Sequence, residues 1–420
     1  MHYSQFLRAL TLGIALGSLF ASTLTATPAQ AGASILIEAD SGKVLRAENA
    51  TYPWYPASVT KLMTMYITLQ AVKQGRITLD TLFTVSRNAL AQAPTKMGFG
   101  VGTQVTVDNA LKMMMVKSAN DMAVLLAEGV DGSIENFADD MTRTAHRLGM
   151  TESNFVNPNG LPADGQITSA RDLAILARAL IHDFAEYNYY WHIPAIKFGR
   201  RVIRNYNKLL GRYPGADGMK TGFICASGYN VVASATRNGR RLIAIVLGAY
   251  SGPVRSQKAA QLLENGFNSG GLSWLTPSLG TVDALTPIDA QPPNLREEMC
   301  GGHRRKPPSE DNDEEQQDVA SGDTGSARSV MLSSLRPPNG KFVLGPPIET
   351  EAPVKVFTGP ADHPDPVQIA EPRAKKKRHV AKKGGGEKKE SGATKDTGAK
   401  NASAPKHAKH AAKPKVSSAN

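Results

Sequence analysis

The apolar side chains that could build a protein core are concentrated in the first two thirds of this 420-residue chain. Hydrophobic residues make up 41% of the total, but beyond about residue 275 aromatic and branched side chains become scarce. Pro-rich stretches, an acidic cluster at 310–318 and a Lys/Ala/Gly-rich end follow. Such segments cannot bury enough apolar surface to offset the entropy lost on ordering. We therefore expect a folded domain over 32–275, a low-complexity linker over 276–372 and a disordered basic tail over 373–420.

The first 31 residues have the pattern of a secretory signal peptide. A basic start ending at Arg8 precedes a largely apolar run from Ala9 to Leu24, and small residues then end in Ala29-Gln30-Ala31. This order predicts cleavage after Ala31 and export to the periplasm or cell envelope. The alternative is an uncleaved anchor, but the short apolar run contains glycines and would only marginally span a hydrocarbon core of about 30 Å.

The net charge of +12 is located in the tail. Residues 373–420 contain 15 Lys and Arg against 3 acidic residues, and this difference equals the whole excess. An argument for binding polyanions therefore applies only to the tail. Because the chain carries an export signal, we expect anionic envelope polymers rather than a specific nucleic acid as its partner. A solvated linker without any partner is the alternative.

Strand patterns lie at both ends of the expected domain, with helical periodicity between them. The runs 34–39 and 44–46 flank an Asp/Gly turn, and the runs 229–236 and 241–247 flank Asn238-Gly239, so two hairpins are predicted. Helices are expected at about 58–74, 107–116, 120–129, 135–148, 170–182 and 256–267. This order predicts an α+β fold, an antiparallel sheet flanked by helices, rather than alternating βαβ units.

Metal and cofactor chemistry find no support in the sequence. The nine histidines form no metal-binding set, and Cys225 and Cys300 have no metal-site spacing. A Cys225–Cys300 bridge is possible in an oxidising compartment, but it would join the predicted core to the predicted linker. The sequence therefore favours two separate thiols, with the bridge as the alternative, and no metal or cofactor is expected.

Three short motifs occur in three different structural contexts. Ser58-Val-Thr-Lys61 begins the first long helix, Ser118-Ala-Asn120 lies between two predicted helices, and Lys220-Thr-Gly222 lies on a strand before the Asn-Gly hairpin. The first two patterns recur in the tail at Ser403–Lys406 and Ser418–Asn420, so neither is evidence alone. The order, spacing and context of all three are typical of penicillin-binding proteins and serine β-lactamases.

The residue types of the first motif suit nucleophilic acyl transfer. A serine hydroxyl is a weak nucleophile that needs an adjacent base, and residues three apart on a helix share a face, so Lys61 can reach the Ser58 oxygen. Burial and a second cation nearby, expected to be Lys220, would favour the neutral amine that accepts a proton. The start of a helix also favours negative charge that develops at Ser58.

The other motif residues are expected to bind the substrate and stabilise the transition state. The backbone amides of Ser58 and Phe223 would form an oxyanion hole. Ser118 would relay a proton to the leaving amine, and Asn120 would orient the substrate amide. The strand residues Lys220, Thr221 and Gly222 would bind the substrate, with the first two holding its terminal carboxylate.

Across about residues 32–275 the sequence resembles the D-alanyl-D-alanine carboxypeptidase family, the low-molecular-mass penicillin-binding proteins. Beyond the three motifs, the resembling segments are Pro56–Thr64, Asn157–Leu161, Ser169–Asp172 and Asp217–Gly222. The resemblance implies a β-lactamase-like fold and an acyl-enzyme on Ser58, with Lys61 as base. It also implies that the enzyme removes D-alanine from peptidoglycan stem peptides in cell-wall maturation, and that β-lactam antibiotics inhibit it by acylating the same serine.

Two features depart from the family. Many members carry a further β-rich domain and a C-terminal amphipathic helix for membrane attachment, and the sequence past about 275 supports neither. Phe223 stands where relatives often have a polar side chain, which bears on substrate preference.

Three alternative functions remain open at this stage. A β-lactamase of class A typically has Asp in the second motif and a separate Glu that activates water, whereas this chain has Ala119 and no matching Glu motif between Ser118 and Lys220. A DD-endopeptidase would use the same site on a different leaving group. A wall-binding scaffold with a vestigial site is the third, and the completeness of the motifs argues against it.

Overall fold

The computed structural model describes residues 32–269, 278–302, 344–346 and 351–366. The predicted signal peptide and basic tail lie outside these ranges. A five-stranded sheet with the order β2-β1-β9-β8-β7 forms the centre, and every neighbouring pair in it is antiparallel. Its strands are β1 (Ser34–Glu38), β2 (Val44–Glu48), β7 (Ala216–Ile224), β8 (Gly228–Arg237) and β9 (Arg240–Ala249). The predicted α+β class is confirmed.

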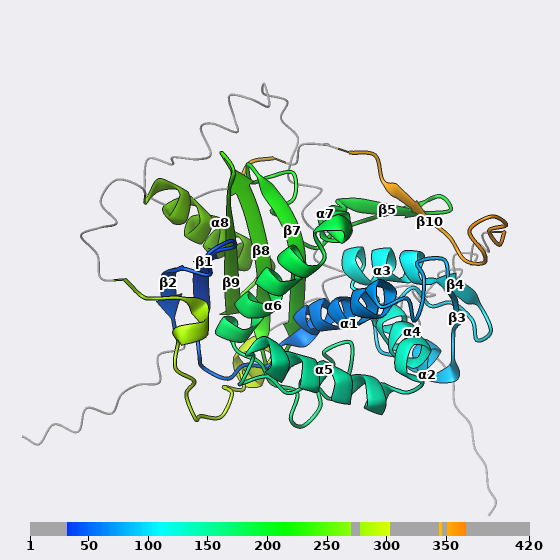
Figure 1. The fold of residues 1–420 in the computed structure, drawn as a ribbon, viewed down its shortest axis with the longest axis horizontal. Helices are drawn as coiled ribbons and strands as arrows, with labels where there is room; N and C mark the ends of the chain where they lie inside the picture. Colours follow the sequence, from blue (N-terminus) through cyan, green and yellow to red (C-terminus); the bar gives the residue numbers. More distant parts are fainter. Residues whose placement is uncertain (1–31, 270–277, 303–343, 347–350, 367–420) are drawn as a thin grey trace, which may run out of the picture. The chain divides into compact units, whose positions relative to one another are not determined.

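Helices cover both faces of this sheet. The longer helices are α1 (Lys61–Lys73), α3 (Val107–Val116), α4 (Asn120–Asp131), α5 (Ile134–Leu148), α6 (Ala170–Asp183) and α8 (Gly252–Asn268). The short ones are α2 (Arg87–Ala91), α7 (Tyr189–His192) and α9 (Arg296–Cys300). In Figure 1, α6 lies in front of β8 and β9 and α8 lies behind them.

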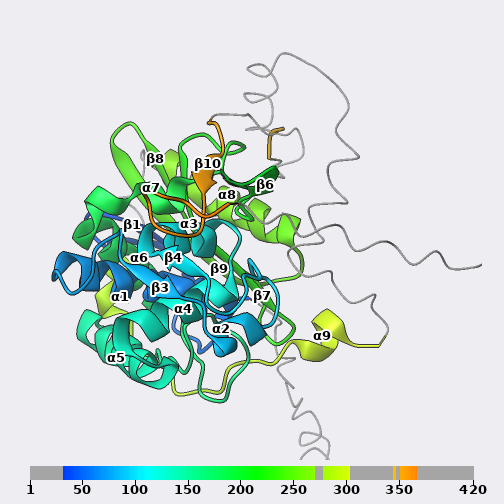
Figure 2. The same ribbon diagram turned by 90° about the vertical axis from the view of Figure 1, so that its right-hand side faces the viewer.

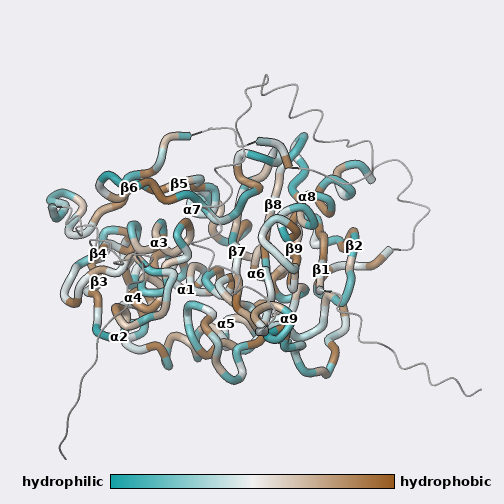
Figure 3. Tube along the Cα trace, turned by 180° about the vertical axis from the view of Figure 1, so that it is seen from behind, coloured by the Kyte–Doolittle hydropathy of each residue, from teal (hydrophilic) through white to brown (hydrophobic). Residues whose placement is uncertain are grey.

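The alternation of side chains along β9 explains this two-sided arrangement. Ile243, Ile245 and Leu247 belong to the large apolar cluster shared with α1, α3, α4 and α6, while Leu242 and Ala244 belong to a second cluster under α8. Successive side chains of a strand point to opposite faces, so an uninterrupted apolar run indicates a strand buried on both sides. In Figure 3 a hydrophobic (brown) stretch marks β1 of the central sheet, whereas the edge strand β2 is partly hydrophilic.

Helix ends and the main hairpin follow local chemistry. Ser133 and Ser169 cap α5 and α6 by accepting hydrogen bonds from the amides of Asn136 and Asp172. Between β8 and β9, Asn238 and Gly239 have φ values of 51° and 73°, as a two-residue hairpin turn with two left-handed positions requires. The predicted hairpin is therefore confirmed.

Two smaller sheets were not predicted. One joins β3 (Leu82–Thr84) and β4 (Gln104–Thr106). The other joins the hairpin of β5 (Ala195–Phe198) and β6 (Arg201–Arg204) to β10 (Val354–Val356), which runs parallel to β5. Figure 2 shows β10, drawn in orange, above α3. The β10 strand comes from the region expected to be a linker.

The prediction of an unstructured linker over 276–372 is wrong for 278–302 and 351–366. Both segments dock on the domain through a few apolar side chains, because Val282, Met299 and Val356 are buried. A preformed surface can hold such segments although they contain too few apolar residues to fold alone.

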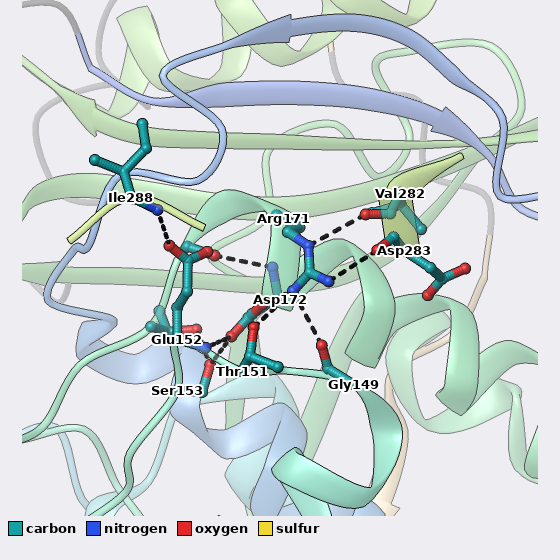
Figure 4. A network of polar contacts seen from close by, with 11 residues as sticks. Gly149, Thr151, Glu152, Ser153, Arg171, Asp172, Val282, Asp283 and Ile288 are labelled. Carbon is teal, nitrogen blue, oxygen red and sulfur yellow. Dashed lines mark hydrogen bonds and ion pairs between the residues drawn. The ribbon is translucent and has the colours of Figure 1, made fainter. Parts of the chain in front are cut away.

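Polar contacts from α6 fix the first of these segments (Figure 4). The Arg171 guanidinium donates hydrogen bonds to the carbonyls of Val282 and Asp283, each at 3.2 Å, and forms an ion pair with Asp172 at 2.7 Å. Glu152 accepts a hydrogen bond from the amide of Ile288 at 3.2 Å. The Ser169–Asp172 segment, noted in the sequence for its family likeness, therefore joins the returning chain to the domain.

The expectation of two separate thiols is also wrong. Cys225, directly after β7, and Cys300, the last residue of α9, form a disulfide with a Cα–Cα distance of 5.7 Å. The sequence disfavours the bridge because its composition places residue 300 in a linker. Docking of 278–302 brings the two residues together, which a local sequence pattern does not reveal.

Candidate active site

The first two motifs meet at the amine of Lys61. Lys61 is the first residue of α1 and is fully buried. Its Nζ lies 3.0 Å from Ser58 Oγ, 2.7 Å from Asn120 Oδ1 and 2.8 Å from the Asn159 carbonyl oxygen. The structure thus brings Ser58, Lys61 and Asn120 together by direct hydrogen bonds. Removal of the Ser58 proton by Lys61 needs no rearrangement in this geometry.

A sharp backbone turn presents Ser58. Ser58 lies in the 3-10 turn Ala57–Thr60 that precedes α1, and Ala57 has a left-handed φ of 51°. Gly160 packs directly on this turn, since a Cβ atom there would lie 1.8 Å from the Ala57 carbonyl oxygen. Only glycine fits such a close backbone approach. The Asn157–Leu161 segment therefore supports the nucleophile from outside the three motifs.

The third motif packs against the backbone of the nucleophile. A Cβ atom added at Gly222 would lie 2.8 Å from the Ser58 nitrogen and 3.0 Å from the Val59 nitrogen. Strand β7 can therefore approach the start of α1 only with glycine at this position. This contact places the backbone of Phe223, the next residue, beside that of Ser58.

Two buried hydroxyl groups from the second and third motifs have no hydrogen-bond partner among the described residues. They are Ser118 Oγ and Thr221 Oγ1, and both residues are about 98–99% buried, with exposed fractions of 1% and 2%. An unsatisfied buried hydroxyl costs about 1–3 kcal/mol, so it calls for an explanation in a native structure. A substrate that supplies the missing partners is the explanation consistent with the position of these motifs.

Loop 93–98 fixes the backbone of the second motif. Ser118 has a left-handed φ of 58°, and its carbonyl accepts a hydrogen bond from Thr95 Oγ1 at 2.7 Å. The Asn120 amide donates to the Thr95 carbonyl at 2.8 Å. The adjacent Asp121 accepts hydrogen bonds from the amides of Met97 and Gly98. Burial raises the pKa of the Asp121 carboxyl above its usual 3.8, and these amides oppose only part of that effect.

Lys220 supplies a second buried cation on β7. Its side chain is 2% exposed, and Nζ donates a hydrogen bond to the carbonyl of Thr221 at 2.9 Å. A buried ammonium group on the strand beside the nucleophile suits an anionic group of a ligand.

Two residues that support the site are not predicted from the sequence. Asn159 accepts the Lys61 hydrogen bond through its backbone carbonyl, which every residue type has, so the sequence gives no signal for it. Asn230 of β8 donates hydrogen bonds to the carbonyls of Tyr55 and Pro56 at 3.0 and 3.1 Å and accepts one from the Gly248 amide. It thereby connects the central sheet to the segment that enters the nucleophile turn. The available signal was a carboxamide directly before the apolar run Val231–Ala233 of a strand.

Comparison with known proteins agrees with this geometry. The model of the D-alanyl-D-alanine carboxypeptidase family matches residues 21–251. The carboxypeptidase DacC of Escherichia coli is 40% identical over 279 residues, which cover 63% of this chain and 70% of that protein. DacF of Bacillus subtilis is 33% identical over 243 residues, covering 57% of this chain and 62% of that protein. The chain therefore spans about two thirds of the length of these relatives.

Solved structures of penicillin-binding proteins share the fold. Penicillin-binding protein 5 of Haemophilus influenzae aligns with a TM-score of 0.54 and 35% identity, covering 57% of this chain and 71% of that one. Penicillin-binding protein D2 of Listeria monocytogenes, in an ampicillin-bound form, aligns with a TM-score of 0.52 and 30% identity, covering 57% and 98%. With its matched family model, its fold and a serine–lysine pair at the start of α1, the chain belongs to the D-alanyl-D-alanine carboxypeptidase family of serine peptidases.

Proposed function

We propose that the protein removes the terminal D-alanine from peptidoglycan stem pentapeptides through an acyl-enzyme on Ser58. The observation that carries this proposal is the 3.0 Å contact between Lys61 Nζ and Ser58 Oγ at the start of a helix. Family membership supports the reaction class, and the carboxypeptidase names of the relatives support the substrate.

In the acylation step, neutral Lys61 accepts the proton of Ser58, and Oγ attacks the carbonyl carbon of the penultimate D-alanine. The amides of Ser58 and Phe223 stabilise the oxyanion of the tetrahedral intermediate. The intermediate collapses when the C–N bond breaks. Ser118 Oγ passes its proton to the leaving amine and takes up the proton that Lys61 had accepted from Ser58, so Lys61 is neutral again. Free D-alanine departs and an ester remains on Ser58.

In the deacylation step, water attacks the ester carbonyl while Lys61 accepts a proton from it. The same two amides stabilise the second oxyanion. The C–O bond to Ser58 then breaks, the proton returns to the serine oxygen, and the shortened peptide leaves with a new carboxylate. Lys61 thus serves both half-reactions from one position.

The terminal carboxylate of the peptide would be held by β7. Lys220 supplies positive charge, and Thr221 Oγ1, which has no partner among the described residues, supplies a hydroxyl donor. Asn120, from the second motif, would orient the substrate amide. Its Oδ1 accepts a hydrogen bond from Lys61.

β-Lactam antibiotics would acylate the same serine as substrate mimics. A relative from Listeria monocytogenes is described in ampicillin- and cefotaxime-bound forms. Incubation with fluorescent penicillin followed by mass spectrometry should place a single adduct on Ser58, and Ser58→Ala should abolish it. An adduct on another residue would refute the assignment of the nucleophile.

The substrate is tested by separate measurements. The purified protein should release D-alanine from a synthetic stem pentapeptide, and this release should exceed the cleavage of a cross-linked dimer. Predominant cross-link cleavage would instead identify a DD-endopeptidase, and rapid turnover of penicillin would identify a β-lactamase.

The organisation and location of the chain belong to the same proposal. Residues 1–31 would be a cleaved signal peptide, 32–275 the catalytic domain, and the site of action the periplasm, where the enzyme would act in cell-wall maturation and cell shape. The Cys225–Cys300 bridge supports an oxidising compartment. Within the described part of the chain, no helix is long and apolar enough to cross a membrane.

The basic tail over 373–420 would bind anionic envelope polymers. Its charge is the support for this proposal. Retention on cell envelopes should fall with rising salt and should disappear when 373–420 is deleted. Equal retention of the truncated protein would leave the tail without this role.

A further inference from the structure

A cavity of about 230 Å³ adjoins the nucleophile. One wall is formed by Ala57, which precedes Ser58, and by Gly160, which packs on it. Ile224, the residue after Phe223, also lines the cavity, as do Asn294 and Arg296 from the segment that returns to the domain. Ala57 and Ile224 are the sequence neighbours of Ser58 and Phe223, so the cavity borders the proposed oxyanion hole.

The direction of a bound peptide along β7 places its acyl part in this cavity. If Lys220 and Thr221 hold the terminal carboxylate and the Phe223 amide contacts the scissile carbonyl, the peptide runs from 220 toward 224. Residues of a strand are spaced about 3.3 Å apart, so the part of the peptide before the scissile bond passes Ile224. The cavity lies on the side of the substrate that stays on Ser58 after acylation.

Arg296 is a positively charged residue in the lining of the cavity. Its side chain is exposed and forms no ion pair with another described residue. Asp164 lines the same cavity, so the two charges balance. A preference for anionic substrates must then arise from direct pairing with the guanidinium rather than from a general positive field. Arginine is suited to this because its planar fork binds a carboxylate with two parallel hydrogen bonds.

The position of Arg296 is fixed by contacts on both sides of it. The preceding Leu295 donates a backbone hydrogen bond to the Ala226 carbonyl at 3.0 Å. The following Met299 is buried, and Cys300 is bridged to Cys225. A preorganised segment lowers the entropy lost when its side chain binds a ligand. These residues also lie beyond 251, where the family match ends.

We propose that Arg296 is a specificity-determining residue that binds a carboxylate on the acyl side of the substrate, and that the Cys225–Cys300 bridge holds it in place. The substrate class is a peptide that ends in D-Ala-D-Ala and carries a free carboxylate on the residue before this pair. The proposal rests on the proposed function, because it uses the assigned direction of the peptide.

A matched pair of peptides tests it. N-acetylglutamyl-D-Ala-D-Ala and N-acetylglutaminyl-D-Ala-D-Ala differ only in one carboxylate, and D-alanine release gives kcat/KM for each. The wild-type protein should prefer the acidic peptide by about two- to fivefold, the range for an exposed ion pair. Arg296→Gln should abolish this preference, and Arg296→Lys should retain part of it.

The matched control is Arg46→Gln. Arg46 is exposed on β2, at the opposite edge of the sheet from β7, and its removal changes the net charge equally. This control should keep the wild-type preference. A preference that survives in Arg296→Gln, or that falls equally in Arg46→Gln, would overturn the role of Arg296.

The bridge is tested by replacing both Cys225 and Cys300 with serine. The double variant should lose most of the preference, and an unchanged preference would overturn the role given to the bridge. Labelling of Ser58 by fluorescent penicillin separates the two proposals. If wild-type protein is labelled and releases D-alanine without a preference, only this inference fails; if it does neither, the proposed function fails.

Discussion

The two sides of the site differ in how completely their polar atoms are paired. On the nucleophile side, Lys61 Nζ contacts three oxygen atoms within 3.0 Å. On the substrate side, Ser118 Oγ and Thr221 Oγ1 are buried without a partner among the described residues. The proposed serine–lysine pair is therefore already in contact without substrate. The two unpaired hydroxyls, by contrast, pay a desolvation penalty that hydrogen bonds from a bound substrate would remove.

Loss of the base should have the largest effect. Lys61→Met keeps a long apolar stem but removes the proposed proton acceptor, so acylation of Ser58 by penicillin should slow about 10²–10⁴-fold. Stopped-flow labelling measures this rate, and Lys43→Met, an exposed substitution between β1 and β2, is the control. A slowing of less than about tenfold would show that another group accepts the proton.

Support of the nucleophile turn should have the next largest effect. Gly160→Ala places a Cβ atom against the Ala57 carbonyl, so it should reduce both penicillin labelling and the free energy of unfolding. Gly75→Ala is a matched control, because Gly75 also has a positive φ, 71°, but a Cβ atom there meets nothing within 4 Å. It should cost only about 1–2 kcal/mol, the penalty of the left-handed conformation.

Denaturant unfolding and labelling of both glycine variants check this prediction. Equal destabilisation would show that the close approach to Ala57 is unimportant.

Paired Thr→Val substitutions test the unpaired hydroxyls directly. Thr64 Oγ1 donates to the Pro158 carbonyl at 2.5 Å, so Thr64→Val should lower the free energy of unfolding by about 1–3 kcal/mol. Thr221→Val removes a buried hydroxyl that has no hydrogen-bond partner in the described part of the chain, so the free energy of unfolding should not fall. Its kcat/KM for D-alanine release should nevertheless drop about tenfold, through loss of a hydrogen bond to a charged group. Destabilisation by Thr221→Val would contradict the contrast between the two sides.

The smallest effect concerns Asp121, which fixes the loop behind the second motif. Its pKa is raised in the folded protein, so the folded state binds its proton more readily than the unfolded chain. The carboxyl therefore contributes most to stability at low pH, and this contribution is lost as the pH rises through the raised pKa.

In the range just above pH 3.8, the unfolding free energy of the wild type minus that of Asp121→Asn should increase as the pH is lowered. Urea titrations at several pH values measure this difference. A decrease on acidification would mean that the loop amides outweigh burial.

The sequence predicted what depends on local chemistry. The Asn238-Gly239 turn set the β8–β9 hairpin, and apolar periodicity located α3 at the residues where it is found. The Ser58–Lys61 contact followed from helical spacing. Contacts between distant segments were not accessible in this way.

The three residues of β10 form a strand only because they pair with β5. The contact between the Asn159 carbonyl and Lys61 depends on the path of the backbone, which the residue type does not predict. The disulfide depended on the docking of a segment that the composition described as a linker. Each of these contacts is decided by packing between elements rather than by the residues next to it in sequence.

The disulfide has a practical consequence for anyone who handles this protein. It joins positions 75 residues apart and so closes a covalent ring that contains β8, β9 and α8. A single proteolytic cut inside this ring leaves one molecule on a non-reducing gel and two fragments after reduction. A cut beyond Cys300 releases the rest of the chain under either condition. Gels run both ways can therefore locate a nick relative to the ring without sequencing.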